Sequence, residues 1–262
     1  MELVEQTAVD LLAMLEAKQT SAVEVMQATL AQIDTKNGPV NAIVSLRDQE
    51  ALLAEAAQAD AAPRRGLLHG LPMAIKDLAD AKGLPTSMGS SLYASEIATS
   101  DDLMVGRLRA AGAIFIGKTN TPEFGLGSHT FNPVHGVTRN PYDLSRSAGG
   151  SSGGAAVALA TRMLVLADGS DMMGSLRNPA AWNNVYGFRP SWGLVPSALS
   201  GESFLHQLST SGPMARSPSD IAALLEVQAG SDPRLPHGRT DAGFMPDAAS
   251  DLAGKRIGWL GD

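Results

Sequence analysis

The chain has 262 residues, 44% of them hydrophobic and 18% charged, which is enough to bury the core of one large domain. Its net charge of -7 argues against a nucleic-acid partner, because affinity for a phosphate backbone depends on Lys and Arg. The absence of cysteine excludes a disulfide framework, a cysteine nucleophile and thiolate metal sites. Residues 1–19 lack the basic segment and apolar run of a secretory signal, and no apolar stretch approaches the roughly 20 residues of a membrane span. We therefore expect a cytoplasmic protein that does not bind membranes.

Helical and strand patterns alternate along the chain. Ser21 and Glu24 form a capping-box pattern, and Asp101 or Asp102 can cap a later helix that Gly112 ends. The predicted helices are 7–16, 21–33, an alanine-rich helix that ends near residue 62, 101–109, 155–163 and 217–230. The predicted strands are 42–47, 71–77, 113–117, 163–171 and 255–262. This alternation predicts an α/β fold, one domain over residues 1–262, around a mixed or parallel sheet. Because its last predicted strand stands at the terminus, we expect the C-terminal part of the fold to be absent.

Two short motifs match known patterns but lack the context that their chemistry needs. Residues 112–119, GAIFIGKT, match the phosphate-loop pattern, yet the four middle residues are typical of a buried strand and not of a flexible loop. Residues 150–154, GSSGG, match a nucleophile elbow centred on Ser152, but turn residues and not a strand precede them. None of the five histidines stands in a context that singles it out. A nucleotide site is therefore rejected, and a Ser-His-Asp triad is not favoured.

Three other segments together suggest serine chemistry without histidine. They are the apolar strand MAIKD (73–77), which carries a lysine, the loop SAGGSSGG (147–154), and the loop DGSDMMGSLRNPA (168–180), which has a serine at its tip. A serine hydroxyl becomes a nucleophile when a base takes its proton, and a desolvated lysine of lowered pKa is such a base. A second serine can relay the proton, and consecutive backbone N–H groups in a turn can hold an oxyanion. Ser151 and Ser175 are separated by a predicted helix and strand, a spacing that can bring the two loops together at one sheet edge.

The chain resembles the amidase signature family over essentially its whole length. The matching stretches are HGLPMAIKDLAD (69–80), RLRAAGAIFIGKTNTPEFG (107–125), SRSAGGSSGGAAVALA (145–160), DGSDMMGSLRNPAAWNNVYGFRPSWGLVP (168–196) and STSGPMARSPSDIAALLEVQAG (209–230). The resemblance implies the amidase-signature fold, with a mixed β-sheet core covered by helices. It also implies a Ser-cisSer-Lys triad with neither a metal nor an organic cofactor.

The resemblance assigns a role to each motif position. Ser175 would be the acylated nucleophile. Ser151 would be the bridging serine, held by a cis peptide bond to Gly150. Lys76 would be the general base, which takes the proton through Ser151. The oxyanion hole would be formed by the backbone N–H groups of Met172, Met173, Gly174 and Ser175. Ser152, Asp171 and Arg177 would support and shape these loops.

This resemblance implies an amidase that hydrolyses a small-molecule carboxylic amide through an acyl-serine intermediate. One alternative is the glutaminase subunit of a tRNA-dependent amidotransferase, which would need partner subunits. A second is a truncated amidase fold without catalytic activity. Met173 stands where the family usually has glycine, and a side chain there could block a positive φ or narrow the pocket. A homodimer remains a possible assembly, since an incomplete sheet would expose an edge.

Overall fold

The computed structural model describes residues 2–196, 204–205, 207–240, 243–245 and 253–259. The helices are α1 (Ala8–Glu16), α2 (Ala22–Val40), α3 (Gln49–Ala61), α4 (Leu103–Ala110), α5 (Gly153–Ala160), α6 (Arg177–Trp182) and α7 (Pro218–Gln228), with 3-10 turns η1 (Leu3–Glu5) and η2 (Glu123–Gly125). The strands are β1 (Ile43–Val44), β2 (Pro72–Lys76), β3 (Ile114–Thr119), β4 (Phe131–Asn132), β5 (Gly136–Val137), β6 (Leu166–Asp171), β7 (Tyr186–Gly187) and β8 (Thr210–Ala215). The predicted α/β class is confirmed.

The strands form two three-stranded sheets and a short hairpin of β4 and β5. In the first sheet, of order β1-β3-β2, β3 pairs parallel with β2 and antiparallel with β1. In the second, of order β6-β8-β7, both pairings are antiparallel. The backbone N–H of Lys76 on β2 donates to Asp168 Oδ1 on β6 at 3.0 Å. This bond joins the two sheets at the level of the predicted site.

Local sequence signals explain where several helices begin. The capping box of α2 is present, since the Ser21 hydroxyl accepts from the Glu24 amide and the Glu24 carboxylate accepts from the Ser21 amide. At α7 the Ser217 hydroxyl is the cap, since it accepts from the backbone amide of Asp220. Asp102 precedes α4 but makes no side-chain cap, because its carboxylate accepts from the Asp80 amide instead.

Helix α5 lies in the interior and is built of small residues. Its residues from Gly153 to Leu159 are all buried. A Cβ atom on Gly154 would lie 2.3 Å from the backbone nitrogen of Asn120 and 2.6 Å from the carbonyl oxygen of Ala42. Glycine at this position therefore lets the start of α5 pack directly on the end of β3.

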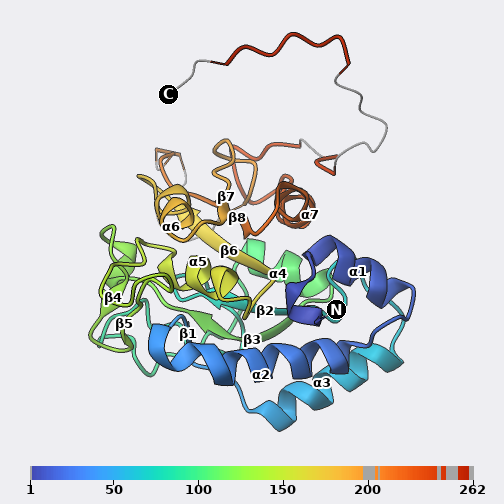
Figure 1. The fold of residues 1–262 in the computed structure, drawn as a ribbon. Helices are drawn as coiled ribbons and strands as arrows, with labels where there is room; N and C mark the ends of the chain where they lie inside the picture. The colour runs from blue at the N-terminus through green and yellow to red at the C-terminus, as the bar shows by residue number, and fades with distance from the viewer. Residues whose placement is uncertain (1, 197–203, 206, 241–242, 246–252, 260–262) are drawn as a thin grey trace.

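Two clusters of buried apolar side chains hold the layers together. One contains α5 residues together with side chains of α2 and α3, and the other joins α1, α4 and α7 to the β2–β3 region. Figure 1 shows α2 and α3 running along one side of the molecule and α7 at the opposite side. None of the helices in these described ranges combines the length and apolarity needed to cross a bilayer.

The predicted strand at 255–262 is wrong for its described part. Residues 255–259 have no strand assignment, and residues 260–262 lie outside the described residues. Ile257 and Trp259 are 73% and 84% exposed, so the apolar pattern of this segment finds no sheet to pair with or pack against among the described residues. Figure 1 shows this part of the chain leading away from the folded body. The predicted strand at 42–47 is also shorter than expected, since only Ile43 and Val44 pair with β3.

Replacing Gly154 with alanine should destabilise the fold. The added methyl group meets backbone atoms on two sides, and overpacking of this kind costs about 1–3 kcal/mol in the free energy of unfolding. Gly106→Ala in the interior of α4 is the matched control, because its nearest contact would be an ordinary 3.8 Å. That control should raise stability by roughly 0.5–1 kcal/mol, the helix preference for alanine. Denaturant midpoints of the two variants test the difference, and equal midpoints would contradict the packing argument.

Candidate active site

The amine of Lys76 lies at the centre of the candidate active site. Its side chain is 1% exposed, and Nζ lies 2.8 Å from Ser151 Oγ, 2.9 Å from Ser152 Oγ and 3.0 Å from Ser170 Oγ. Lys76 is the last residue of β2, and Ser170 lies on β6. Each sheet and the start of α5 thus contribute a group to one buried polar cluster. A buried amine surrounded by hydroxyls is arranged to exchange protons with them.

The turn before α5 presents Ser151 to the lysine. The peptide bond between Gly150 and Ser151 is cis, as the resemblance implies. A Cβ on Gly150 would lie 3.0 Å from the backbone at Ser128 and His129, so this glycine also permits close packing. Ser151 and Ser152 precede the N-terminal end of α5, where the helix dipole is positive and disfavours a protonated amine.

Burial decides the protonation state of the lysine. It lowers the pKa of Lys76 from 10.5 to about 7, against the opposing fields of Asp168 and Asp171. Burial likewise raises the pKa of Asp168 to about 6, although Lys118 and Lys76 oppose this. At neutral pH a large fraction of Lys76 is therefore uncharged and able to act as a base.

The loop after β6 places Ser175 beside the serine turn. The backbone N–H of Ser152 donates to the carbonyl oxygen of Ser175 at 3.2 Å, and Ser175 is half-buried. The two loops that the sequence predicts to meet therefore do meet. The structure brings Lys76, Ser151 and Ser152 into direct contact and places the backbone of Ser175 next to them.

Asp171 organises the loop that carries Ser175. Its carboxylate accepts from the backbone N–H groups of Gly174 at 2.7 Å and Leu176 at 3.1 Å. It also accepts from Arg177 Nε at 3.0 Å and Arg189 Nη1 at 2.8 Å. Burial alone would raise the pKa of this carboxyl, but the hydrogen bonds from the two guanidinium groups and the two amides hold it well below its usual range. The carboxylate therefore stays charged and fixes the turn that carries Ser175.

The unusual Met173 does not distort this turn. The positive φ in the loop, 122°, occurs at Gly174, and Met173 is not among the residues with positive φ. The Met173 side chain is 89% exposed, so it leaves the turn toward the surface. The Gly174 amide donates to Asp171, whereas the amides of Met172, Met173 and Ser175 make no hydrogen bond within the described part of the chain. These three N–H groups are the ones available for the predicted oxyanion hole.

Three residues of the site are not predicted from the sequence. The Ser170 hydroxyl contacts the Lys76 amine, and the Asp168 carboxylate accepts a hydrogen bond from the Lys76 backbone amide. Arg189 donates to both the carboxylate and the carbonyl oxygen of Asp171. Alternation along β6 could have indicated the two strand residues, since Asp168 and Ser170 lie on the same face two positions apart. No comparable signal points to Arg189, which reaches Asp171 from 18 positions away in the sequence.

The two rejected motifs have ordinary structural roles. Residues 114–119 form strand β3 and are all buried, so the predicted strand is confirmed and the phosphate-loop pattern is coincidental. Within the described residues the Ser152 hydroxyl makes no hydrogen bond with a histidine; it accepts from the Lys76 amine and donates to the carbonyl oxygen of Ser170. Across the described ranges, no three His, Asp or Glu side chains gather closely enough to hold a metal ion.

Comparison with known proteins identifies the family of this chain. A family model described as amidase matches residues 24–262. The chain belongs to the amidase signature family. It is 38% identical to an acylamidase of Rhodococcus erythropolis over 259 residues, which cover 97% of this chain and 54% of that protein. It is 39% identical to one subunit of the glutamyl-tRNA(Gln) amidotransferase of Chromohalobacter salexigens over 261 residues, which cover 97% of this chain and 53% of the relative.

The fold agrees with solved members of the family. The structure of a bacterial aryl acylamidase of this family superposes with a TM-score of 0.84 at 32% identity, covering 90% of this chain and 50% of the other. The fold prediction is therefore confirmed. The chain spans about half the length of the curated relatives that it matches.

The protonation of Lys76 can be measured directly. In protein labelled at lysine 13Cε, the resonance that disappears in Lys76→Ala should titrate with a midpoint near pH 7, because burial disfavours the charged amine. Asp168→Asn removes a negative charge that favours the protonated amine, so the midpoint should move to lower pH. Asp143→Asn, at an exposed turn, should leave it unchanged. A midpoint near 10.5 in the unmodified chain would contradict the proposed burial effect.

Proposed function

We propose that this chain hydrolyses a small-molecule carboxylic amide through an acyl-Ser175 intermediate. The observation that carries the proposal is the buried Lys76 amine, 2.8 Å from Ser151 Oγ and with a pKa of about 7. Membership of a family that includes acylamidases supports the same reaction class.

The proposed reaction starts with proton transfer. Neutral Lys76 takes the proton of Ser151, which takes the proton of Ser175 as the Ser175 oxygen attacks the carbonyl carbon. The negative charge that develops on the carbonyl oxygen is held by backbone N–H groups of the 172–175 turn. The proton returns from Lys76 through Ser151 to the leaving nitrogen, and the C–N bond breaks to release ammonia or an amine. A water molecule then attacks the acyl-serine, with the same relay as its base, and releases the carboxylic acid.

Ser170 and Ser152 have a supporting role in this scheme. Both hydroxyls accept from the Lys76 amine, so they hold Nζ in place and leave Ser151 as the hydroxyl nearest to it. Asp171 and its arginines keep the nucleophile turn rigid throughout the cycle. Orientation of this kind accounts for much of the acceleration that enzymes achieve.

Covalent labelling tests the nucleophile. A small fluorophosphonate should add one adduct to the purified chain, located at Ser175, because the relay activates that hydroxyl. Ser175→Ala should take no adduct, and Lys76→Ala should slow labelling by about 100-fold or more, the usual contribution of a general base. Intact mass followed by peptide mapping measures both.

The control for labelling is Ser145→Ala, which removes an exposed serine from a turn outside the site. It should label like the unmodified chain. A folded chain without an adduct, or an adduct that persists in Ser175→Ala, would contradict the proposed function.

Turnover without partners distinguishes an independent amidase from a component of an amidotransferase. We expect the purified chain to release ammonia or an amine from simple amides, as measured by a coupled ammonia assay and by chromatography of the product amine. Release of ammonia from glutamine only when partner subunits are added would instead favour the amidotransferase alternative. Labelled Ser175 without turnover under either condition would show an activated serine but contradict amide hydrolysis by this chain.

A further inference from the structure

An aromatic pair adjoins the backbone segment that approaches the bridging serine. A Cβ atom on Gly125 would lie 3.7 Å from Ser151 Oγ and 2.6 Å from Leu78 Cδ1, so the backbone of η2 packs against the bridging serine. The preceding residue, Phe124, is 43% exposed, and its ring meets that of Tyr93 edge-on with centroids 6.2 Å apart. Tyr93 is 42% exposed. A partly open aromatic pair therefore begins at the residue next to the backbone that contacts Ser151.

The backbone at this edge is strained. Phe124 has a φ of +54°, and Met88, whose carbonyl accepts the Phe124 amide at 2.8 Å, has a φ of +51°. A bulky side chain in the left-handed region is an outlier that costs free energy. Such conformations persist where the surrounding structure enforces them, and they concentrate where a ligand is held.

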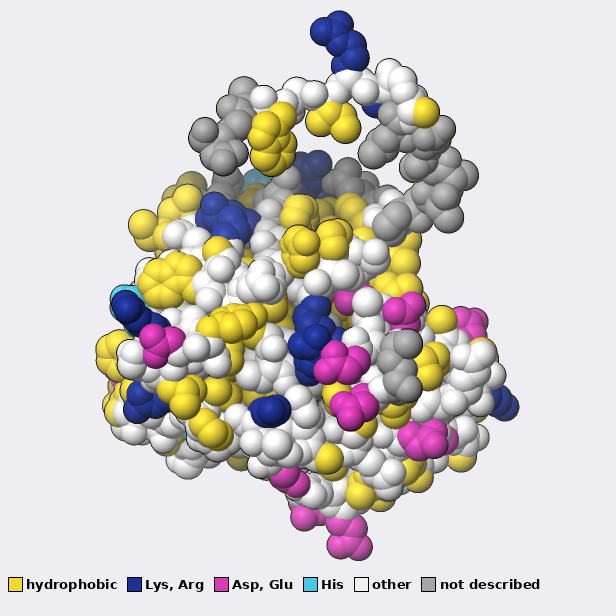
Figure 2. Space-filling view, viewed as in Figure 1, with side chains coloured by type: hydrophobic (Ala, Val, Ile, Leu, Met, Phe, Trp, Pro, Cys, Tyr) yellow, Lys and Arg dark blue, Asp and Glu magenta, His cyan; other side chains and the backbone are white. Residues whose placement is uncertain are grey.

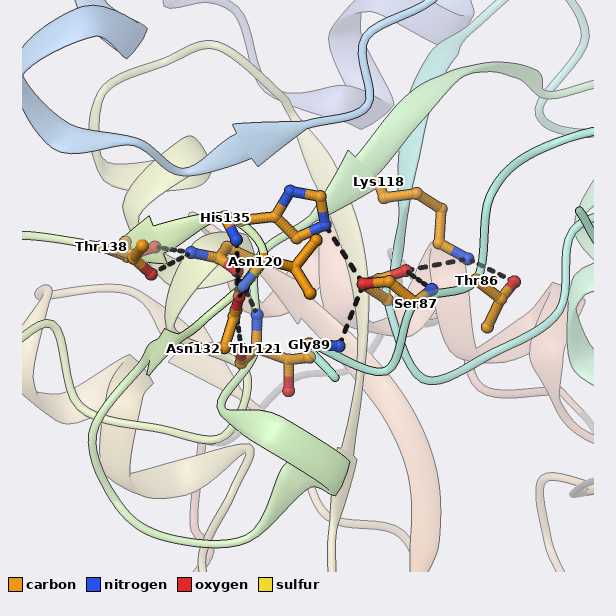
Figure 3. A network of polar contacts seen from close by, with 12 residues as sticks. Thr86, Ser87, Gly89, Lys118, Asn120, Thr121, Asn132, His135 and Thr138 are labelled. Atoms are coloured by element: carbon orange, nitrogen blue, oxygen red, sulfur yellow. Dashed lines mark hydrogen bonds and ion pairs between the residues drawn. The ribbon is translucent and has the colours of Figure 1, made fainter. Parts of the chain in front are cut away.

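A buried polar network enforces this conformation. Asp77, the residue after Lys76, accepts from the Ser87 amide at 3.1 Å and from Ser87 Oγ at 2.5 Å, while the Gly89 amide donates to Ser87 Oγ at 3.0 Å. These bonds fix both neighbours of Met88. His135 Nε2 lies 3.2 Å from Ser87 Oγ, and Figure 3 shows Ser87 between His135 and Lys118. The strand that supplies the lysine therefore also fixes the aromatic pair.

The nucleophile loop adds further apolar surface. Met172 and Met173 are 49% and 89% exposed, and their loop carries Ser175. Two arginines that contact this loop, Arg177 and Arg189, are both bound to Asp171. Figure 2 shows hydrophobic side chains spread over the β4, β5 and α6 region, whereas most acidic side chains in that view lie over α1, α2 and α3.

We propose that Phe124 and Tyr93 form an aromatic contact for the substrate, so that the preferred amide carries an aryl group. This inference rests on the proposed function. In this proposal the substrate's ring packs on the exposed part of Phe124, next to the backbone of Gly125 that approaches Ser151, and an aromatic contact together with buried apolar area favours the aryl compound about tenfold or more. The left-handed backbone at Phe124 sets the direction of its side chain.

Two reagents with the same reactive group test the acyl side. Methanesulfonyl fluoride and phenylmethanesulfonyl fluoride both modify an activated serine. The Ser175 Oγ–S bond forms, the S–F bond breaks, and the hydroxyl proton passes to Ser151 and Lys76. The ratio of their second-order rate constants, followed by intact mass and corrected for the ratio with free hydroxide, should favour the phenyl reagent at least about tenfold. The leaving-amine side is tested by the ratio of the hydrolysis rate constants of acetanilide and N-methylacetamide, corrected for the same ratio with free hydroxide.

Matched variants test whether the rings of Phe124 and Tyr93 cause the aryl preference. Phe124→Ala and Tyr93→Ala should each reduce the aryl preference severalfold, and Phe124→Tyr, which keeps a ring, should retain it. Trp259→Ala, an exposed aromatic in the C-terminal tail, should leave both rate constants unchanged. An aryl preference on either side that Phe124→Ala removes supports the proposal.

Absence of an aryl preference on both sides would overturn the inference, as would a preference that survives in both alanine variants. Failure of the proposed function has a different signature, because neither sulfonyl fluoride would then modify Ser175. Modification by methanesulfonyl fluoride without an aryl preference would leave the amidase proposal standing and remove only this one.

Discussion

The Lys76 amine is buried and its nearest partners are hydroxyl groups. The arrangement of the rest of the site depends on these partners. In the described part of the chain, no carboxylate lies within 4.0 Å of Nζ, so no ion pair stabilises the charged form. Desolvation therefore decides the charge of the amine. A hydroxyl partner can give up or receive a proton, whereas a neighbouring carboxylate would stabilise the ammonium and oppose its use as a base.

The other buried charges are paired in ways that keep carboxylates away from the Lys76 amine. Lys118, on the adjacent strand β3, is also fully buried, but its amine lies 3.9 Å from Asp77 and donates to the carbonyl oxygen of Ala79. Asp171 is occupied by two arginines and two backbone amides. Each of these carboxylates is oriented by its own partners. Two lysines on neighbouring strands thus have different chemical surroundings, because Lys76 and Lys118 belong to opposite faces of the sheet.

Sequence reasoning predicts the parts of this protein that depend on local signals. The capping box at Ser21, the helix that follows Ser217, the strand that carries Lys76 and the two serine loops all follow from short patterns and from the family resemblance. Contacts between distant segments are not encoded in such patterns, which is why the contact of Arg189 with Asp171 is not predicted.

Strand β8 escapes prediction for a related reason. β8 contains Gly212 and Pro213 and lacks a clear alternation, so its pairing with β6 depends on tertiary context. The strand expected at the C-terminus shows the opposite error. An apolar pattern at 255–259 indicates a strand only where a neighbouring strand is available to pair with it.

The bond between the Lys76 amide and Asp168 joins two sheets that otherwise carry separate parts of the chemistry. The Lys76 amine is carried by β2, and the loop that contains Ser175 follows β6. The spacing between them is therefore a property of how the two sheets dock, and not of either sheet alone. A small sliding of one sheet past the other would open the proton path while leaving every strand pairing intact. In the proposed mechanism the proton path therefore depends on the contact between β2 and β6, which the bonds from Lys76 to Asp168 and Ser170 fix.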